Sequence, residues 1–557
     1  MSFNELGQSI PPDTAHAVSV SLPTWKSNVG YEEGEEWVLS KMKTGYPRYE
    51  FYIHQCIANF ADTITACHGK AEERAMVFPS HCVASRFVDF LKSHGPSLRP
   101  SEVRIVELVP SPHPKNGIMN METLAKIYAA LFPEHLFKLA KSFWQHSGEG
   151  VSSRQAEFAH RAYEEGALSE RKLAPAGANN DSRPCKGPRR YQRGASTDKT
   201  VAQPIAGRAP TQTYLEPEAN GTFEGREYSQ FIEERFGRNL DLSFVQNAKL
   251  AIRRRIAGSL TADVDLKEAI NTLKILQKWG PGCLFYGHGS SQDLDDLEGR
   301  LKRGDRYLAL FCEFPSNPLL KSPDIERIRL LADKYGFAVV VDETIGNFMN
   351  VHVLPFADAV VSSLTKVFSG DSNVMGGSCV LNPGSPLYTL LKDTLAAEYE
   401  DNYWAEDAIF MERNSRDFVS RIDRINVNAE AICDVLKAHR RVKEVHYPKC
   451  SPTRSCYERC RNPNGGYGGL LSVTFFSTPE TVTFFDRLET AKGPSLGTNF
   501  TLCCPFTLLA HYGELEWASQ FGVEADLIRI SVGLEETSEL VMRFERALEA
   551  IACLVIE

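Results

Sequence analysis

The sequence predicts an α/β fold with a mostly parallel sheet, an α+β C-terminal domain and an extra α/β region at the N-terminus. Short apolar runs, FAVVV at 337–341 and ADAVVSS at 357–363, alternate with helical patterns. Buried strands that alternate with helices are typical of a parallel sheet covered on both faces. Beyond about residue 385 the runs LLSVTFF and LIRISV, set between longer helices, indicate the α+β domain.

One helix between two of the predicted strands has clear boundary signals. Ser322 is the expected N-cap, Pro323 the expected first helical residue, and Gly336 the expected stop. Between them, apolar residues recur on one face at helical spacing: Ile325, Ile328 and Leu331.

The length of the chain points to several domains. Its 557 residues exceed the roughly 250–300 that a single hydrophobic core holds. The stretch 179–210 has seven Lys or Arg against two Asp and no apolar period, which indicates a flexible basic linker. We predict four parts: an N-terminal extension (1–178), this linker (179–222), a large domain (223–385) and a C-terminal domain (386–557).

Composition favours a small-molecule function. The net charge of −9 gives no basic field for nucleic acid or anionic lipid. No apolar run reaches the roughly 18–20 residues of a membrane span, and the polar start lacks a signal peptide, so we expect a cytoplasmic protein. The 14 cysteines contain no C-x-x-C pair. We expect reduced thiols, including Cys450, Cys456 and Cys460, and no metal site.

An aspartate and a lysine follow two successive predicted strands. Asp342 ends one and Lys366 lies just beyond the next, 24 positions later (366 minus 342). Ligands of open parallel sheets bind outside the carboxyl ends of the strands. An amine and a carboxylate at such an edge suit pyridoxal phosphate, because the lysine forms a Schiff base and the carboxylate keeps the ring nitrogen protonated. Ser363 and Thr365 offer hydroxyls to the phosphate.

A structural interpretation of the same residues is available. An Asp after a strand is often a helix cap or turn former, and a lone S-x-T-K is common. The two motifs together, each after its own buried strand, favour the cofactor.

Several motifs resemble a known family. CEFPSNPLL, VVVDETIGN, SSLTKVFSGDSNVMGG, GPSLGTNFTL and LIRISVGLEE are similar to motifs of the pyridoxal-phosphate enzymes of cysteine and methionine metabolism. The stretch LPTWKSNVGYEEGEEWVLSKMKTGYPR resembles the N-terminal extension of the fungal cystathionine γ-synthases. The resemblance implies the fold type I, or aspartate-aminotransferase-like, architecture. It also implies a homodimer or homotetramer that uses small amino-acid substrates.

The resemblance assigns roles around the cofactor. Lys366 is implied as the Schiff-base lysine and proton shuttle, and Asp342 as the partner of the pyridine nitrogen. Ser363 and Thr365 are implied phosphate ligands. Arg235 is the implied arginine of an arm that reaches a neighbouring subunit's phosphate.

The resemblance also assigns the substrate contacts. Arg529 is implied to bind the substrate carboxylate, assisted by Ser495. Asn317 is implied to contact both the cofactor ring oxygen and the substrate carboxylate. For Arg529 the alternative is a surface salt bridge on an edge strand, which its mostly apolar strand disfavours.

The implied reaction is γ-substitution on an O-acyl-L-homoserine by L-cysteine, the trans-sulfuration step of methionine biosynthesis. Two alternatives stay open. A related pyridoxal-phosphate enzyme can use another sulfur or carbon nucleophile in secondary metabolism, or a catalytically impaired homologue can act as an assembly partner.

The sequence departs from the family pattern near 258–272. The family's Gly-Met dipeptide, whose backbone N–H groups hold the phosphate, does not occur in this chain. Ala269 replaces the tyrosine that stacks on the ring, and Glu233 replaces the tyrosine that precedes Arg235 by two positions. An omitted segment of the gene, compensating contacts, or lost catalysis each account for this. We favour the omitted segment, because the other site residues are kept.

Overall fold

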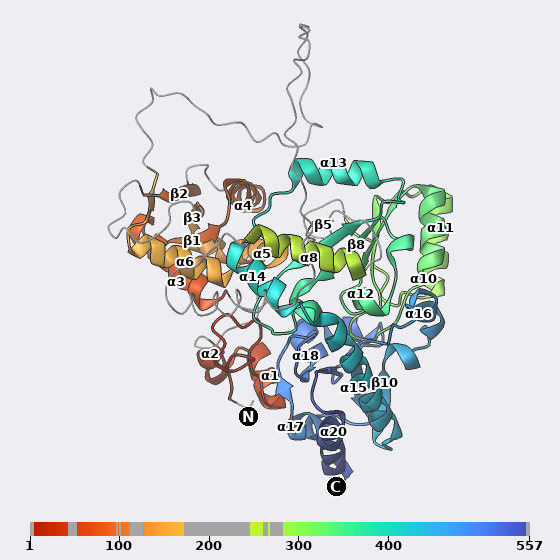
Figure 1. The fold of residues 1–557 in the computed structure, drawn as a ribbon. Helices are drawn as coiled ribbons and strands as arrows, with labels where there is room; N and C mark the ends of the chain where they lie inside the picture. The colour runs from red at the N-terminus through yellow and green to blue at the C-terminus, as the bar shows by residue number, and fades with distance from the viewer. Residues whose placement is uncertain are drawn as a thin grey trace, which may run out of the picture. The chain divides into compact units, whose positions relative to one another are not determined.

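The computed structural model describes residues 5–42, 53–95, 99, 102–111, 126–171, 245–259, 266–267 and 282–552. The predicted linker lies outside them, and Figure 1 shows the described elements in chain order. Every helix within these ranges is too short or too polar to span a bilayer.

Alternating side chains give the N-terminal region a sheet with two covered faces. Successive residues of strand β3 belong in turn to two separate hydrophobic cores, as the period of two in a strand requires. Helices α3 and α6 contribute to the first core and α4 and α5 to the second (Figure 1). The strands pair antiparallel in the order β1-β3-β2-β4. The elements are α3 (Gln55–His68), β1 (Glu73–Phe78), α4 (His81–His94), β2 (Arg104–Pro110), β3 (Ile127–Pro133), α5 (Phe137–Ser147), α6 (Ser153–Glu164) and β4 (Leu168–Glu170).

A segment before this region reaches distant parts of the chain. It holds α1 (Trp25–Glu32) and α2 (Glu36–Met42). The N–H of Val18 donates to the carbonyl of Ser372 at 2.8 Å, and the N–H of Leu22 donates to that of Lys492 at 3.0 Å. We call this segment, residues 5–42, the strap, because these hydrogen bonds tie it to distant parts of the chain.

The second sheet contains the strands that the apolar runs predict. Its order is β5-β9-β8-β7-β6, with β6, β7 and β8 parallel and with β9 and β5 antiparallel to their neighbours. The described part is thus mixed, with its parallel strands at one side. The strands are β5 (Leu266–Lys267), β6 (Ala309–Glu313), β7 (Ala338–Asp342), β8 (Ala359–Ser363) and β9 (Gly377–Leu381).

Helices accompany this sheet, and one begins later than the sequence predicts. Gly336 ends α11 with φ of 75°, as expected, but the N-cap is Asp324 rather than Ser322. The Asp324 carboxylate accepts the N–H of Arg327, whereas the N–H of Ser322 donates to Thr453. Ser322 is therefore used in a long-range contact. The helices are α8 (Val245–Ser259), α10 (Ser291–Arg303), α11 (Ile325–Tyr335), α12 (Asn347–Asn350), α13 (Tyr388–Glu398), α14 (Ala405–Asn414) and α15 (Phe418–Ala438).

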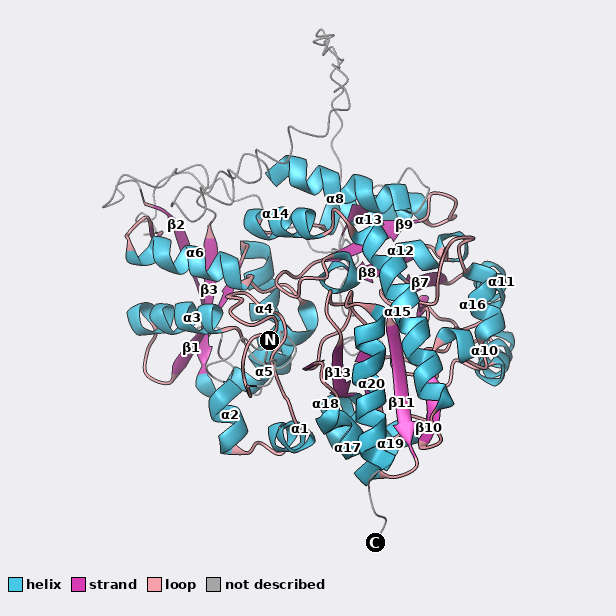
Figure 2. Ribbon diagram, turned by 60° about the horizontal axis from the view of Figure 1, so that its bottom comes forward, coloured by secondary structure: helices cyan, strands magenta, loops and turns pink. Residues whose placement is uncertain are grey.

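A third sheet follows, in the order β10-β11-β14-β13-β12. The first six residues of LLSVTFF form the fully buried β11, and the middle of LIRISV forms β14, as the sequence predicts. Figure 2 shows α15 and α20 lying along β11. Apolar residues of this sheet and of the second sheet share one continuous core, and the predicted domain boundaries stay predictions. The elements are β10 (Val442–His446), α16 (Arg454–Cys460), β11 (Leu470–Phe475), α17 (Thr478–Arg487), β12 (Ala491–Lys492), β13 (Leu502–Pro505), α18 (Phe506–His511), α19 (Leu515–Ser519), β14 (Ile528–Ser531) and α20 (Thr537–Ala552).

A buried carboxylate fixes the start of β7 and β8. Asp358 is fully buried and accepts the N–H of Val339 at 2.7 Å and the Nη1 of Arg329 at 2.9 Å. The hydroxyl of Ser385 also donates to it.

We expect Asp358→Ala to lower the free energy of unfolding by about 3 kcal/mol, because it leaves a guanidinium and an amide N–H without their buried acceptor. Urea denaturation followed by tryptophan fluorescence measures this. Asp333→Ala is the matched control, since the exposed Asp333 carboxylate also pairs with Arg329. It should change stability by less than about 1 kcal/mol. Equal effects of the two substitutions would contradict the assigned role of Asp358.

Candidate active site

The parallel strands end together at one edge of the second sheet. In the register, Glu313 of β6 faces Asp342 of β7, and Asp342 faces Val361 of β8. Lys366 follows three residues after Ser363, the last residue of β8. Asp342 and the segment that carries Lys366 therefore leave the carboxyl ends of neighbouring strands, where ligands of such sheets bind.

Asp342 is a half-buried carboxylate that pairs with no cationic side chain among the described residues. The N–H of Thr344 donates to its Oδ1 at 2.9 Å, and burial raises its pKa. The neighbouring Glu343 is fully buried, and neither of its carboxyl oxygens accepts a hydrogen bond. Burial raises the pKa of Glu343 well above its ordinary value, which favours its neutral form. A protonated ring nitrogen is the kind of partner that Asp342 lacks, so this edge fits a pyridinium.

Lys366 lies in a single helical turn, Leu364–Phe368, and has non-helical backbone angles of φ −82° and ψ −130°. Its Nζ donates to the Oγ of Ser495 at 3.4 Å. Ser495 comes from the loop between β12 and β13, 129 positions along the chain. The lysine amine is thus placed between the second and third sheets.

A glycine lets that loop approach the lysine closely. Gly497 has a φ of +69°, in the region that favours glycine. A Cβ at this position would lie 2.8 Å from the Cβ of Lys366 and 2.6 Å from the backbone nitrogen of Val367. The N–H of Gly497 donates to the Oγ of Ser531 at 2.7 Å, which anchors the loop on β14.

A buried arginine holds the other side of the lysine turn. Arg421 of α15 donates through Nη1 to the carbonyl of Val367 at 2.9 Å and through Nη2 to that of Phe368 at 2.8 Å. Its Nη1 also donates to the side chain of Asn499 at 2.9 Å. Arg421 therefore joins the lysine turn to the same loop that carries Ser495.

Arg529 is a buried cation on β14. Its guanidinium donates through Nη2 to the carbonyls of Pro494 and Ser495, at 2.7 and 3.0 Å, and through Nη1 to the Oδ1 of Asn317 at 3.3 Å. It also lies 4.8 Å from the centre of the Phe506 ring. The strand is internal in its sheet, between β11 and β13, so the edge-strand salt bridge is excluded. Arg529 makes no ion pair with a described carboxylate, which suits it to an anionic ligand.

The two predicted phosphate ligands have local partners. The Thr365 hydroxyl donates to the carbonyl of Gly376 at 3.3 Å and accepts its N–H at 3.1 Å. The N–H of Ser363 donates to the Oγ1 of Thr344 at 2.8 Å. Thr344 thus links Asp342 to the end of β8. Their phosphate contacts stay predictions.

Sequence reasoning missed Thr344, Gly497 and Arg421. Thr344 stood in the quoted VVVDETIGN motif, and Gly497 in GPSLGTNFTL, so a signal was present for both. Arg421 lies in a core-packed helix with no motif. Arg235 and most of 258–272, including Ala269, lie outside the described residues.

Comparisons with known proteins identify the family. The model described as "Cys/Met metabolism PLP-dependent enzyme" matches residues 274–549, and "Fungal trans-sulfuration enzyme, N-terminal domain" matches residues 56–152. A cystathionine gamma-synthase of Neurospora crassa is 50% identical over 98% of each chain. The chain belongs to the Cys/Met metabolism PLP-dependent enzymes. This membership confirms the predicted family, fold class, enzyme class and cofactor.

Two further curated relatives match over nearly the whole chain, and a solved structure matches over part of it. A cystathionine gamma-synthase of Saccharomyces cerevisiae is 34% identical over 99% of each chain. The cystathionine gamma-synthase-like enzyme iboG2 of Amanita muscaria is 40% identical over 98% of this chain and 96% of its own. The solved cystathionine gamma synthase of Xanthomonas oryzae pv. oryzae has a TM-score of 0.46 and 25% identity, over 51% of this chain and 72% of that one.

The chain is shorter than its Neurospora relative within the aligned region. That alignment spans 619 positions and the chain has 557 residues, so at least 62 positions (619 minus 557) face no residue of this chain. The match to the Cys/Met metabolism family begins only at residue 274.

We expect Gly497→Ala to weaken pyridoxal phosphate binding at least tenfold, because the added methyl group pushes against the backbone and side chain of Lys366. Spectrophotometric titration with the cofactor measures the Kd. Gly513→Ala is the control, since a Cβ there meets nothing within 4 Å. Unchanged binding in Gly497→Ala would show that the loop does not position the lysine.

Proposed function

We propose that the chain is a cystathionine γ-synthase that joins an O-acyl-L-homoserine to L-cysteine, with release of the acyl group as a carboxylic acid. The observation that carries the proposal is the link from Arg529 through Ser495 to Lys366. This chain of contacts supports a role for Arg529 in binding a carboxylate and for Lys366 in moving a proton. The names of the Neurospora and Saccharomyces relatives support the same reaction.

The proposed cofactor contacts follow from the described geometry. Bound pyridoxal phosphate supplies an aldehyde that takes up amines and a ring that accepts electrons. Lys366 would hold the aldehyde end, and Asp342 would keep the proton on the ring nitrogen. Ser363 and Thr365 would contact the phosphate, together with Arg235 of the proposed arm.

Different residues have the roles of proton transfer and of orienting the substrate and the lysine amine. As a free amine, the Nζ of Lys366 would remove the proton from the substrate Cα. Ser495 orients that amine through its hydroxyl. Arg529 and Asn317 hold the substrate carboxylate, which fixes the Cα–H bond toward Lys366.

The choice of acyl group and nucleophile belongs to this proposal as well. Relatives with lower identity have other names, such as the alanine racemase ungC of Aspergillus violaceofuscus at 31% identity. Another sulfur or carbon nucleophile stays the second candidate. We also propose a homo-oligomer in the cytoplasm.

The departure near 258–272 is best explained by a segment omitted from this sequence. Such a segment would supply the missing Gly-Met turn, and the alignment with the Neurospora relative has room for it, with at least 62 positions (619 minus 557) that face no residue of this chain. Sequencing the transcript across 258–272 tests this directly. An uninterrupted transcript that encodes only the present residues would favour lost catalysis or compensating contacts.

We expect borohydride reduction of the cofactor-loaded protein to fix one pyridoxyl group on Lys366, detected by peptide mass spectrometry. Lys492 is the control, because it is a buried lysine whose pKa is lowered by burial, but its Nζ donates to the carbonyl of Asp486 instead. Label on Lys492 and none on Lys366 would overturn the assignment.

The reaction itself is tested with L-cysteine and either O-acetyl- or O-succinyl-L-homoserine, with cystathionine measured by mass spectrometry. Wild-type protein should form cystathionine from at least one donor, and Lys366→Ala should lose on the order of 10²–10⁴-fold in rate. A product from another nucleophile only would favour the second candidate. No turnover with added cofactor would favour the assembly partner.

A further inference from the structure

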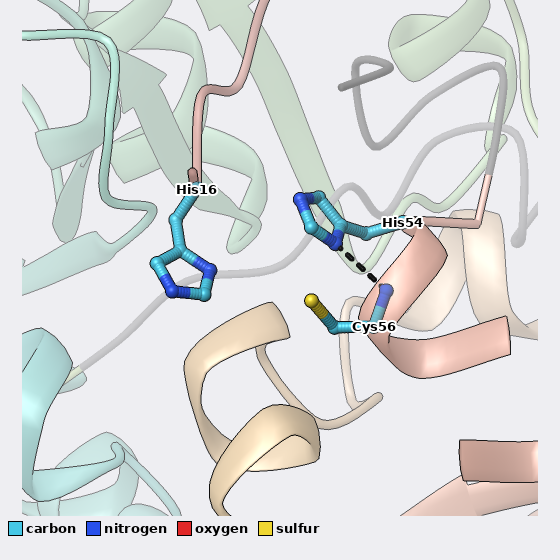
Figure 3. Close-up of side chains that lie close together, drawn as sticks. All are labelled: His16, His54 and Cys56. Carbon is cyan, nitrogen blue, oxygen red and sulfur yellow. Dashed lines mark hydrogen bonds between the residues drawn. The ribbon is translucent and has the colours of Figure 1, made fainter. Parts of the chain in front are cut away.

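A cluster of metal-binding side chains lies in the N-terminal part, away from the candidate active site. One nitrogen each of His16 and His54 and the sulfur of Cys56 lie within 4.8 Å of one another. Figure 3 shows the three side chains converging from the strap and from the first turn of α3. Both imidazoles are buried, at 5% and 8% exposure.

We propose that His16, His54 and Cys56 bind a zinc-class divalent cation, with Glu157 as the adjacent carboxylate. Imidazole nitrogen, thiolate and carboxylate oxygen are the donors that Zn²⁺ takes in proteins. Tetrahedral zinc, with bonds of about 2.0–2.3 Å, separates its ligand atoms by roughly 3.3–3.7 Å. The three donors therefore need to approach by no more than about 1.5 Å, which side-chain rotation provides.

The surrounding hydrogen bonds orient the two rings. The Nδ1 of His54 accepts the N–H of Cys56 at 3.2 Å, so a metal would bind at its Nε2. The Nδ1 of His16 contacts the Oγ of Ser153 at 3.0 Å, and its Nε2 lies 3.2 Å from the Oε2 of Glu157. Whichever nitrogen of His16 binds the metal, the other keeps an oxygen partner, as second-shell groups of metal-bound histidines do.

The positive charge of the nearby Arg154 is paired with carboxylates. Arg154, next to Ser153 on α6, donates through Nη1 to Asp407 at 2.9 Å and lies 3.9 Å from Glu406. Its guanidinium also stacks 4.0 Å from the centre of the Phe410 ring. Its charge is therefore compensated by two carboxylates.

The proposed site has a structural role. It would join the strap, through His16, to α3, and through Glu157 to α6. Two residues after His16, the N–H of Val18 donates to Ser372, six positions beyond Lys366. A metal at His16 would thus fix the strap close to Val18, where the strap contacts the segment that follows Lys366. The inference does not depend on the proposed reaction.

The test uses tag-free full-length protein, stripped with a chelator and titrated with Zn²⁺ against a chromophoric competitor. We expect about one zinc per chain and at least a tenfold loss of affinity in His54→Ala and in Cys56→Ser. The controls are Cys67→Ser and His68→Gln at the far end of α3, outside the cluster, and they should bind zinc like the wild type. Circular dichroism shows that each variant is folded.

X-ray absorption of the zinc-loaded wild type identifies the metal ligands directly and needs no substitution. We expect a sulfur at about 2.3 Å and nitrogen or oxygen at about 2.0–2.1 Å. Cobalt substitution should give a thiolate charge-transfer band that Cys56→Ser removes. Less than about one tenth of a zinc per chain, a metal shell without sulfur, or equal binding by Cys56→Ser and Cys67→Ser overturns the proposal. The cluster would then be a buried polar joint only.

Discussion

The parallel register of β7 and β8 is the constraint on which the candidate site depends. It brings the carboxyl ends of two strands side by side, so that Asp342 and the turn bearing Lys366 leave the sheet at one edge. Asp358 fixes the opposite ends of these strands through the amide of Val339. A slip of one residue would turn Asp342 to the other face of the sheet. The positions of Asp342 and of the turn that bears Lys366 therefore depend first on the backbone pairing of β7 and β8.

The third sheet contributes the remaining residues of the candidate site. Arg529 and the loop at Ser495 come from it, and Gly497 allows the loop to touch the backbone at Lys366. Arg421 then clamps the lysine turn against the same loop. One hydrophobic core runs through both sheets, so it fixes the Arg529 guanidinium relative to the lysine turn.

Local patterns made much of this predictable. Apolar runs located β7, β8, β11 and β14, and Gly336 marked the end of α11. Motifs named Asp342, Lys366, Asn317, Ser495 and Arg529 as neighbours, and the contacts link the last three directly. Contacts between residues that lie far apart in the sequence could not be predicted. Arg421 donates to Val367, which lies 54 positions away in the sequence. The N–H of Ser322 donates to Thr453, 131 positions away, and Asp324 caps the helix instead of Ser322. The pairing of His16 with the start of α3 was hidden for the same reason.

The central claim is that Asp342 and Lys366 hold opposite ends of one pyridoxal phosphate ring. A crystal structure of the borohydride-reduced protein tests it most directly. We expect the ring nitrogen within about 2.6–3.0 Å of a carboxylate oxygen of Asp342, with the reduced bond at the Nζ of Lys366. A ring nitrogen that faces another side chain, with Asp342 turned away from the cofactor, would contradict the account.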